Sequence, residues 1–316
     1  MATKEICPVN LQEREWNLDW LTALAPVLLL GLVYFRWQVL ALAVVGAAAY
    51  MAVAALIDRR ELMSRRVEGG LVTGVLVTLC LPATAPVWTT ALACAVAALL
   101  VAGIDFGGRR FGFATAPVCP ALAGYLLVRY LFPAAVSTYP MPAMWASVDA
   151  TTGATPLAAL SDPSAQEPIH RMLAGIHPSA IGEGCGLVLV LAALYLLLRR
   201  RLRLIAPAVM LGTVCLLSQV LWSAPWYGLL SGGVLLAALI LADRAYAPAS
   251  WWAQILCGLT AGGVTVLMRH ATGTDGSAVG VLAACLVGFV WWLVARWIAP
   301  LCGANKENFT KTEKKG

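Results

Sequence analysis

The sequence reads GLVTGVLV at residues 70–77 and GLLSGGVL at residues 228–235, an offset of half of the 316-residue chain. Both runs are apolar, both contain glycine, and both lead into a proline or an acid, in CLPATAP (80–86) and ILADRAYAP (240–248). Matching interrupted segments in two halves predict inverted repeats, with freed backbone groups that face a ligand near the midplane of a membrane. The alternative is that the glycines only let helices pack closely.

The composition around these runs indicates a polytopic integral membrane protein. Hydrophobic residues make up 60% of the chain and charged residues 12%, whereas a soluble domain has about 25% charged residues. The polar N-terminal segment shows no cleavable signal peptide. The nine cysteines include no C-x-x-C pair, so we interpret them as small hydrophobes and expect no metal site.

Ten apolar stretches are candidate membrane spans, since a spanning helix needs about 20 residues. The fold class that they predict is an all-α integral membrane protein of two inverted five-helix repeats. The candidate spans are 18–35, 38–57, 69–83, 86–104, 114–132, 181–198, 204–222, 226–242, 251–268 and 278–298.

The arginines between these stretches test the count, because cytoplasmic loops carry the excess of basic residues. One set of loops carries eleven arginines and the opposite set carries four. The first set is Arg59, Arg60, Arg65, Arg66, Arg109, Arg110, Arg199, Arg200, Arg201, Arg203 and Arg244; the second is Arg36, Arg129, Arg171 and Arg269. We therefore expect both termini in the cytoplasm. This asymmetry accounts for the net charge of +6 without nucleic-acid binding.

The same count divides the chain into five parts. We expect a cytoplasmic segment at 1–17, repeats at 18–132 and 181–298, a non-cytoplasmic loop at 133–180, and a cytoplasmic tail at 299–316.

The non-cytoplasmic loop contains DATTGATPL at residues 149–157. Its hydroxyls, glycine and proline are typical of a capped surface turn. The order Asp149, Thr152, Gly153, Ala154, Thr155 also matches the D-x-x-[ST]-G-A-T pattern at which a flavin transferase attaches FMN, through a phosphoester to the last threonine. Trp145 lies just before the motif and is a candidate to shield or stack on the flavin ring.

Four segments resemble one family over most of the chain: the D subunit of Rnf-type electron transport complexes, whose relative is the B subunit of the sodium-pumping NADH:quinone oxidoreductase. They are GGLVTGVLVTLCLPATAPVW (69–88), DATTGATPL (149–157), GIHPSAIGEG (175–184) and LLSGGVLLAALILADRAYAP (229–248). The flavinylation motif is the most specific of the four.

The resemblance implies covalent FMN on Thr155, acting as an electron carrier on the outer face of a bacterial or archaeal cytoplasmic membrane. It implies ferredoxin:NAD electron transfer coupled to Na⁺ or H⁺ movement, by a complex in which the isolated chain has no complete activity. The implied partners are a peripheral covalent-FMN subunit, small membrane subunits and the flavin transferase. The resemblance leaves open whether a second, non-covalent flavin is bound.

The chain also departs from the family pattern. Ala116 and Cys119 stand where many members have asparagine before the fifth span, and Arg244 stands where a proline usually follows Asp243. These changes affect the ion pathway or a second flavin site more than the motif at Thr155.

Other polar residues are weaker candidates. Asp58, Asp105, Asp243 and Asp275 fall at the ends of predicted helices, where we expect solvated caps, with Asp243 as the candidate for ion coupling. We interpret His170 and His177 as exposed loop residues, and the alternative is that they contact the flavin.

Two other functions fit the sequence. Inverted repeats with broken helices also suit a secondary transporter, in which Thr155 is an ordinary turn residue. A flavinylated subunit of an extracytoplasmic electron-export system would keep the flavin without ion pumping.

Overall fold

The helices of this protein are seen in a computed structural model that describes residues 8–57, 63–111, 116–142, 156–160 and 166–298. These residues form thirteen α-helices and two short 3-10 helices. The α-helices are α1 (Pro8–Phe35), α2 (Trp37–Ile57), α3 (Met63–Cys80), α4 (Val87–Phe111), α5 (Pro120–Leu131), α6 (Pro133–Val136), α7 (Ile169–Ala174), α8 (Gly186–Leu198), α9 (Ile205–Trp222), α10 (Pro225–Leu230), α11 (Val234–Leu241), α12 (Trp251–Thr272) and α13 (Ser277–Ile298); the 3-10 helices are η1 (Pro156–Ala159) and η3 (Glu183–Cys185).

Six of the described helices are long and apolar enough to cross a bilayer: α1, α2, α4, α9, α12 and α13. Their mean hydropathy reaches 2.4 in α2, and many of their large apolar side chains face outward, as in lipid-facing helices. The chain is therefore an all-helical, multi-pass membrane protein. The other four predicted spans correspond to the shorter helices α3, α5 and α8, and to α10 with α11.

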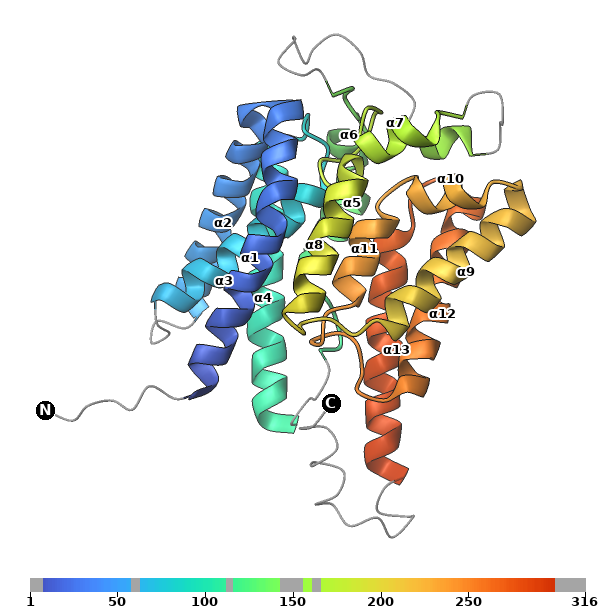
Figure 1. Cartoon of the computed structure of the whole chain (residues 1–316). Helices are drawn as coiled ribbons and strands as arrows, with labels where there is room; N and C mark the ends of the chain where they lie inside the picture. Colours follow the sequence, from blue (N-terminus) through green and yellow to red (C-terminus); the bar gives the residue numbers. More distant parts are fainter. Residues whose placement is uncertain (1–7, 58–62, 112–115, 143–155, 161–165, 299–316) are drawn as a thin grey trace, which may run out of the picture.

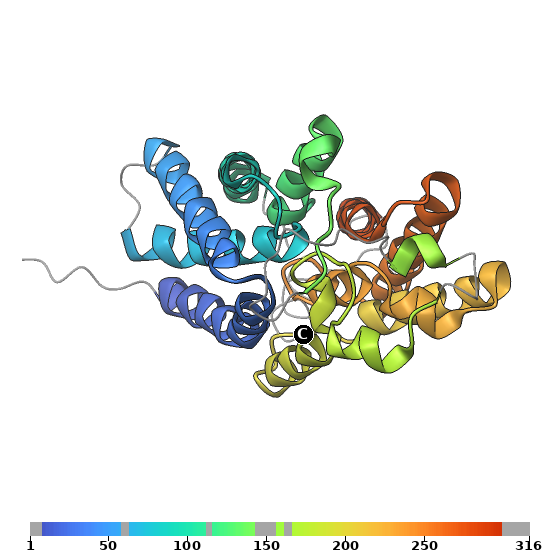
Figure 2. The same ribbon diagram turned by 90° about the horizontal axis from the view of Figure 1, so that it is seen from above.

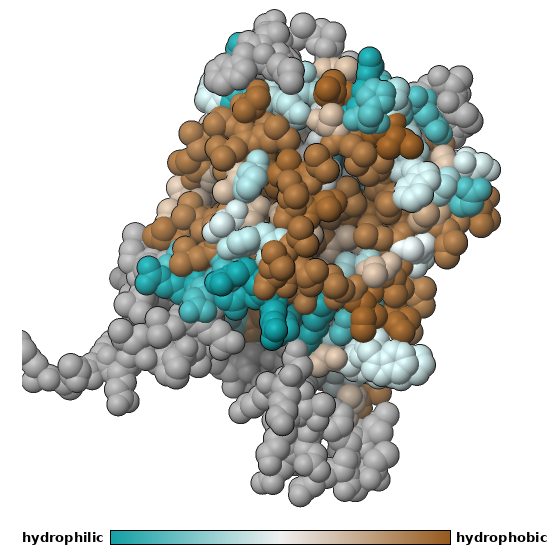
Figure 3. Space-filling model, in the orientation of Figure 1, coloured by the Kyte–Doolittle hydropathy of each residue, from teal (hydrophilic) through white to brown (hydrophobic). Residues whose placement is uncertain are grey.

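The two ends of the helix bundle differ (Figure 1). The terminal end holds the start of α1 and the end of α13, and the loop end, opposite, holds α6 and α7. A hydrophobic band separates hydrophilic residues at the two ends (Figure 3). Contacts between connecting segments agree with this division into two ends. Leu202 pairs with Asp243 at the terminal end, and the Tyr34 hydroxyl donates to the carbonyl of Ala174 at the loop end.

Proline and glycine account for the helix boundaries in three of the four predicted spans that contain short helices. Helix α3 ends at Cys80, two residues before Pro82, and α5 begins only at Pro120. The predicted span 226–242 is two helices, α10 and α11, separated by Ser231, Gly232 and Gly233. Gly232 has a φ of 67°, a conformation that glycine adopts without steric cost.

The two matching sequence runs have different structures. GLLSGGVL contains the break between α10 and α11, but GLVTGVLV is continuous helix within α3, so the expected interruption of the first run is wrong. A Cβ on Gly74 would lie 2.8 Å from the backbone nitrogen of Ala47 in α2. The glycines of the first run serve close helix packing, and those of the second run serve a helix break.

Each half of the bundle has the same order of contacts. Helix α2 packs against α3 and α4, and α4 against α5; α9 packs against α10, α11 and α12, and α12 against α13. The halves lie side by side when the molecule is viewed along the bundle (Figure 2).

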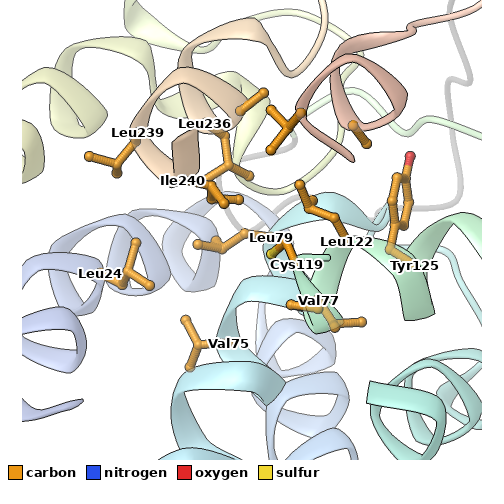
Figure 4. Packing of buried hydrophobic residues seen from close by; sticks show 14 of the residues in the cluster. Leu24, Val75, Val77, Leu79, Cys119, Leu122, Tyr125, Leu236, Leu239 and Ile240 are labelled. Carbon is orange, nitrogen blue, oxygen red and sulfur yellow. The ribbon is translucent and has the colours of Figure 1, made fainter. Parts of the chain in front are cut away.

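The core lies where the halves meet, and α11 is its centre. All eight residues of α11 are buried. Leu236, Leu239 and Ile240 from α11 lie near residues of α1, α3 and α5, among them Leu79 and Leu122 (Figure 4). A half-length helix is thus enclosed by protein on every side, where its unpaired ends need protein partners.

Candidate functional site

The predicted flavin-attachment residues Trp145, Asp149, Thr152, Gly153, Ala154 and Thr155 lie outside the described residues, but the chain that follows them is placed at the loop end. Pro156 is buried at the start of η1. Leu160 is 4% exposed and packs with Met172 of α7 and with Ala224 and Tyr227 at α10. This packing fixes the chain directly after Thr155 against α7 and α10.

The two histidines of this region have different environments. His170 of α7 is exposed, as expected. His177 is 1% exposed and its Nδ1 has no hydrogen-bond partner among the described residues, so the expectation that it is an exposed loop residue is wrong. Burial lowers the pKa of His177, and the imidazole is therefore neutral at pH 7.

The break between α10 and α11 is held by a buried arginine of α12. Arg269 Nη1 donates to the carbonyl of Gly228 at 2.5 Å, and Nη2 donates to the carbonyl of Ser231 at 2.6 Å. The side chain of Arg269 is fully buried. These are carbonyls at the C-terminal end of α10, where a helix presents unpaired acceptors and a partial negative charge, so the guanidinium replaces the missing helical donors.

The N-terminal end of α11 meets a carboxylate. Asp275 accepts from the N–H of Gly233 at 3.2 Å, from Ser277 Oγ at 2.5 Å and from Arg269 Nη2 at 2.9 Å. Burial disfavours its ionised form, but the charge of Arg269 and the hydrogen bonds from Ser277 and Arg269 outweigh burial and hold the pKa of Asp275 below its ordinary value. Asp275 is a charged partner of the broken helix, and its interpretation as a solvated cap is wrong.

A small cavity of about 20 Å³ adjoins this ion pair, which is room for about one water molecule. Glu183 of η3, Asp275 and Ser277 line it, together with Tyr125 of α5 and Cys80 of α3. The site therefore combines polar groups from both halves of the molecule at the loop end of α11.

Asp243 lies at the opposite end of α11. It is 2% exposed and accepts a hydrogen bond from the Ala245 N–H at 3.0 Å, so the solvated-cap interpretation is wrong here too. Burial raises the pKa of Asp243 to about 7, although the Ala245 N–H, the Trp16 indole and the charges of Arg201 and Arg203 favour the ionised form. Each end of the buried helix thus has a carboxylate beside it.

The remaining sequence candidates do not join these sites. Asp105 is exposed within α4 instead of at its end, and Asp58 lies outside the described residues. Sequence reasoning missed Arg269 and Glu183. Glu183 falls inside the predicted span 181–198, and an ionisable residue inside a predicted span is a signal that could have found it.

The fold and these contacts define a class: a multi-pass α-helical membrane protein with a discontinuous helix enclosed between two halves. Comparison with known families then identifies the group, because residues 10–300 match the model of the NQR2, RnfD, RnfE family. The chain belongs to that family.

Curated relatives carry related names. The chain is 25% identical over 283 residues to the D subunit of the proton-translocating ferredoxin:NAD(+) oxidoreductase complex of Clostridium ljungdahlii, with 83% of each chain covered. It is 30% identical to the D subunit of the Na(+)-translocating ferredoxin:NAD(+) oxidoreductase complex of Acetobacterium woodii, over 78% of this chain and 77% of the relative. It is 31% identical to the B subunit of the Na(+)-translocating NADH-quinone reductase of Chromohalobacter salexigens, over 64% of this chain and 51% of the relative.

Proposed function

We propose that this chain is the flavin-carrying membrane subunit of an Rnf-type ion-translocating ferredoxin:NAD oxidoreductase, with FMN bound covalently through the Thr155 hydroxyl. Membership of the family supports this function. The observation that carries it is the complete order Asp149, Thr152, Gly153, Ala154, Thr155 in a segment whose next residues pack at the loop end.

The described surroundings of Thr155 suit such a group. Because Pro156 is buried and Leu160 is packed against α7 and α10, the chain that directly follows Thr155 is held at the loop end. A covalent bond to Thr155 would retain the flavin there without a dedicated pocket for the ring. His170 and Trp226 are exposed side chains of the same two helices. Bound FMN would supply a redox centre for electron exchange with a peripheral flavoprotein, and the chain would keep that centre tethered.

We also propose a membrane topology for the chain. Ten crossings in two inverted five-helix repeats place both termini in the cytoplasm and the loop end outside. The matching order of helix contacts in the two halves supports the repeats. The arginines of the α8–α9 connection lie at the terminal end, where Arg199 and Arg201 pair with Asp19, and this supports the orientation through the positive-inside rule.

Ion coupling belongs to the same proposal. Asp243 at the terminal end of α11 is the candidate residue for ion coupling, because it is a buried carboxyl at the end of a helix that follows a break. The ends of such discontinuous helices bind ions in membrane transporters. The other subunits of the complex and a flavin transferase are the partners.

In-gel flavin fluorescence of the denatured chain tests whether the flavin is covalently attached. In cells that contain the transferase, the wild-type band should fluoresce, and Thr155→Val should be dark because the phosphoester has no hydroxyl to form on. Thr151→Val is the matched control: it changes a threonine at an unspecified position of the pattern and should stay fluorescent. A fluorescent Thr155→Val band would refute the attachment site, and a dark wild-type band would favour a secondary transporter.

A further inference from the structure

Two carboxylates share the cavity at the loop end of α11. A Cβ built on Gly233 would lie 3.4 Å from an oxygen of Asp275 and 3.4 Å from an oxygen of Glu183. Both oxygens thus lie close to one point, where two negative charges oppose each other. Such a pair resists double ionisation, and the surroundings decide which partner keeps the charge.

The surroundings of Asp275 favour its charge. It is ion-paired with Arg269 and accepts hydrogen bonds from Ser277 and from the backbone N–H of Gly233, directly before α11. A carboxylate with an arginine and several donors is held ionised, and the positive end of α11 adds to this effect.

Glu183 has weaker support for a charge. Its Oε2 accepts from the N–H of Ala180, in its own turn, at 3.3 Å. The apolar side chains of Leu236 and Ala237 line the same cavity. Burial and the nearby charge of Asp275 both disfavour an ionised Glu183, which precedes α8.

We propose that Glu183 is a proton-exchanging carboxyl at the loop end of the broken helix, and that Asp275 stays ionised as the fixed partner of Arg269. Glu183 takes up a proton from water in the cavity and returns it there, without forming or breaking any other bond. This inference does not require FMN on Thr155.

Polar side chains connect the cavity with the surface at the loop end. Arg129 Nη1 donates to the hydroxyl of Tyr125, which lines the cavity, at 2.6 Å and to the hydroxyl of Tyr139 at 3.5 Å. Arg129 and Tyr139 are partly exposed. Burial raises the pKa of Tyr139 to about 12, so its hydroxyl stays protonated at neutral pH.

The titratable and charged groups that line the cavity with Glu183 or act on its charge lie on α3, α5 and α12 and in the segments that follow α6 and α12. They are Asp275, Arg269, Arg129, Tyr125, Tyr139 and Cys80. With both carboxylates ionised the cluster has two negative and two positive charges, so protonation of Glu183 changes its net charge by one.

A carbodiimide tests the two roles, because dicyclohexylcarbodiimide reacts with neutral carboxylic acids in apolar sites. The acid O–H adds across a C=N bond, and the adduct rearranges to a stable N-acylurea that keeps all atoms of both reactants. Membranes that contain the full complex are treated at about pH 6 and at about pH 8, both above the ordinary pKa of a glutamic acid, where an exposed carboxyl is ionised. Mass spectrometry of the wild-type chain should find the adduct on Glu183 at the lower pH, several-fold less at the higher pH, and none on Asp275 at either.

Two variants and a second measurement sharpen the test. Arg269→Gln removes the partner of Asp275 and should make Asp275 reactive. Infrared difference spectra of the complex between the two pH values should show the carbonyl band of a neutral carboxylic acid, and Glu183→Gln should lose it. An adduct on Asp275 in the wild type, or an adduct on Glu183 that is equal at both pH values, would overturn the proposal. So would unreactive Glu183 together with infrared spectra that Glu183→Gln leaves unchanged.

Discussion

The pKa of the Asp243 carboxyl group depends on its burial. It is 2% exposed at the terminal end of α11, and burial raises its pKa to about 7. Asp275, at the other end of the helix, has a pKa below its ordinary value because Arg269 is its ion-pair partner. Both aspartates lie near arginine charges. Asp275 also has a direct ion pair with Arg269 and a hydrogen bond from Ser277, and it lies at the N-terminal end of α11, so these groups together account for the difference.

Asp243 predicts a pH dependence of stability. Its pKa in the folded chain is about 7 and its ordinary value is 3.8, so the folded state binds the proton more tightly than the unfolded state does. Stability from this group is therefore present at low pH and falls as pH rises through the window between the two values, by up to about 1.4 kcal/mol per pH unit.

Asp243→Asn should remove that slope, because the amide does not ionise. The temperature of half-unfolding in detergent, followed from about pH 5 to about pH 8, should fall more steeply with pH for the wild type than for the variant. Parallel curves would show that Asp243 does not carry the proton.

Helices in both halves approach one another closely at glycine residues. A Cβ on Gly124 of α5 would lie 2.1 Å from the carbonyl oxygen of Ala93 in α4, and a Cβ on Gly280 of α13 would lie 2.4 Å from that of Ala261 in α12. In lipid, where apolar surface gains little from burial against other helices, such backbone contacts carry much of the packing.

Alanine substitution at these glycines should separate the helix pairs. We expect Gly124→Ala and Gly280→Ala each to destabilise the chain by about 1–3 kcal/mol, because backbone atoms have to move. Gly103→Ala in α4 and Gly263→Ala in α12 are the matched controls: a Cβ there meets nothing within 4 Å, and alanine favours helix. Thermal unfolding in detergent measures all four, and equal effects in both pairs would contradict this account of the packing.

The whole molecule combines these contacts into two halves around α11. Sequence periodicity and charge predict the apolar helices, their order and the grouping of basic connections. The break between α10 and α11 has a sequence signal in Gly232 and Gly233, but the groups that stabilise it do not. Arg269 reaches Gly228 across 41 residues, and only folding brings them together. The same holds for Glu183 and Asp275, which come from separate turns.

The proposed orientation predicts which residues a membrane-impermeant maleimide can reach in intact spheroplasts. His170→Cys, at an exposed position of α7, should be labelled without permeabilisation, because the loop end faces outward. Arg244→Cys, at an exposed position of the terminal end, should be labelled only after permeabilisation. Labelling of the wild-type chain gives the background signal from its native cysteines. The opposite pattern would invert the topology and place residue 155 in the cytoplasm.

The most direct test of the central claim is mass spectrometry of the peptide that contains residues 149–157, from cells that possess the flavin transferase. The peptide should carry the added mass of FMN, localised by fragmentation to the Thr155 side chain. An unmodified peptide from those cells, or FMN localised to another residue, would contradict it.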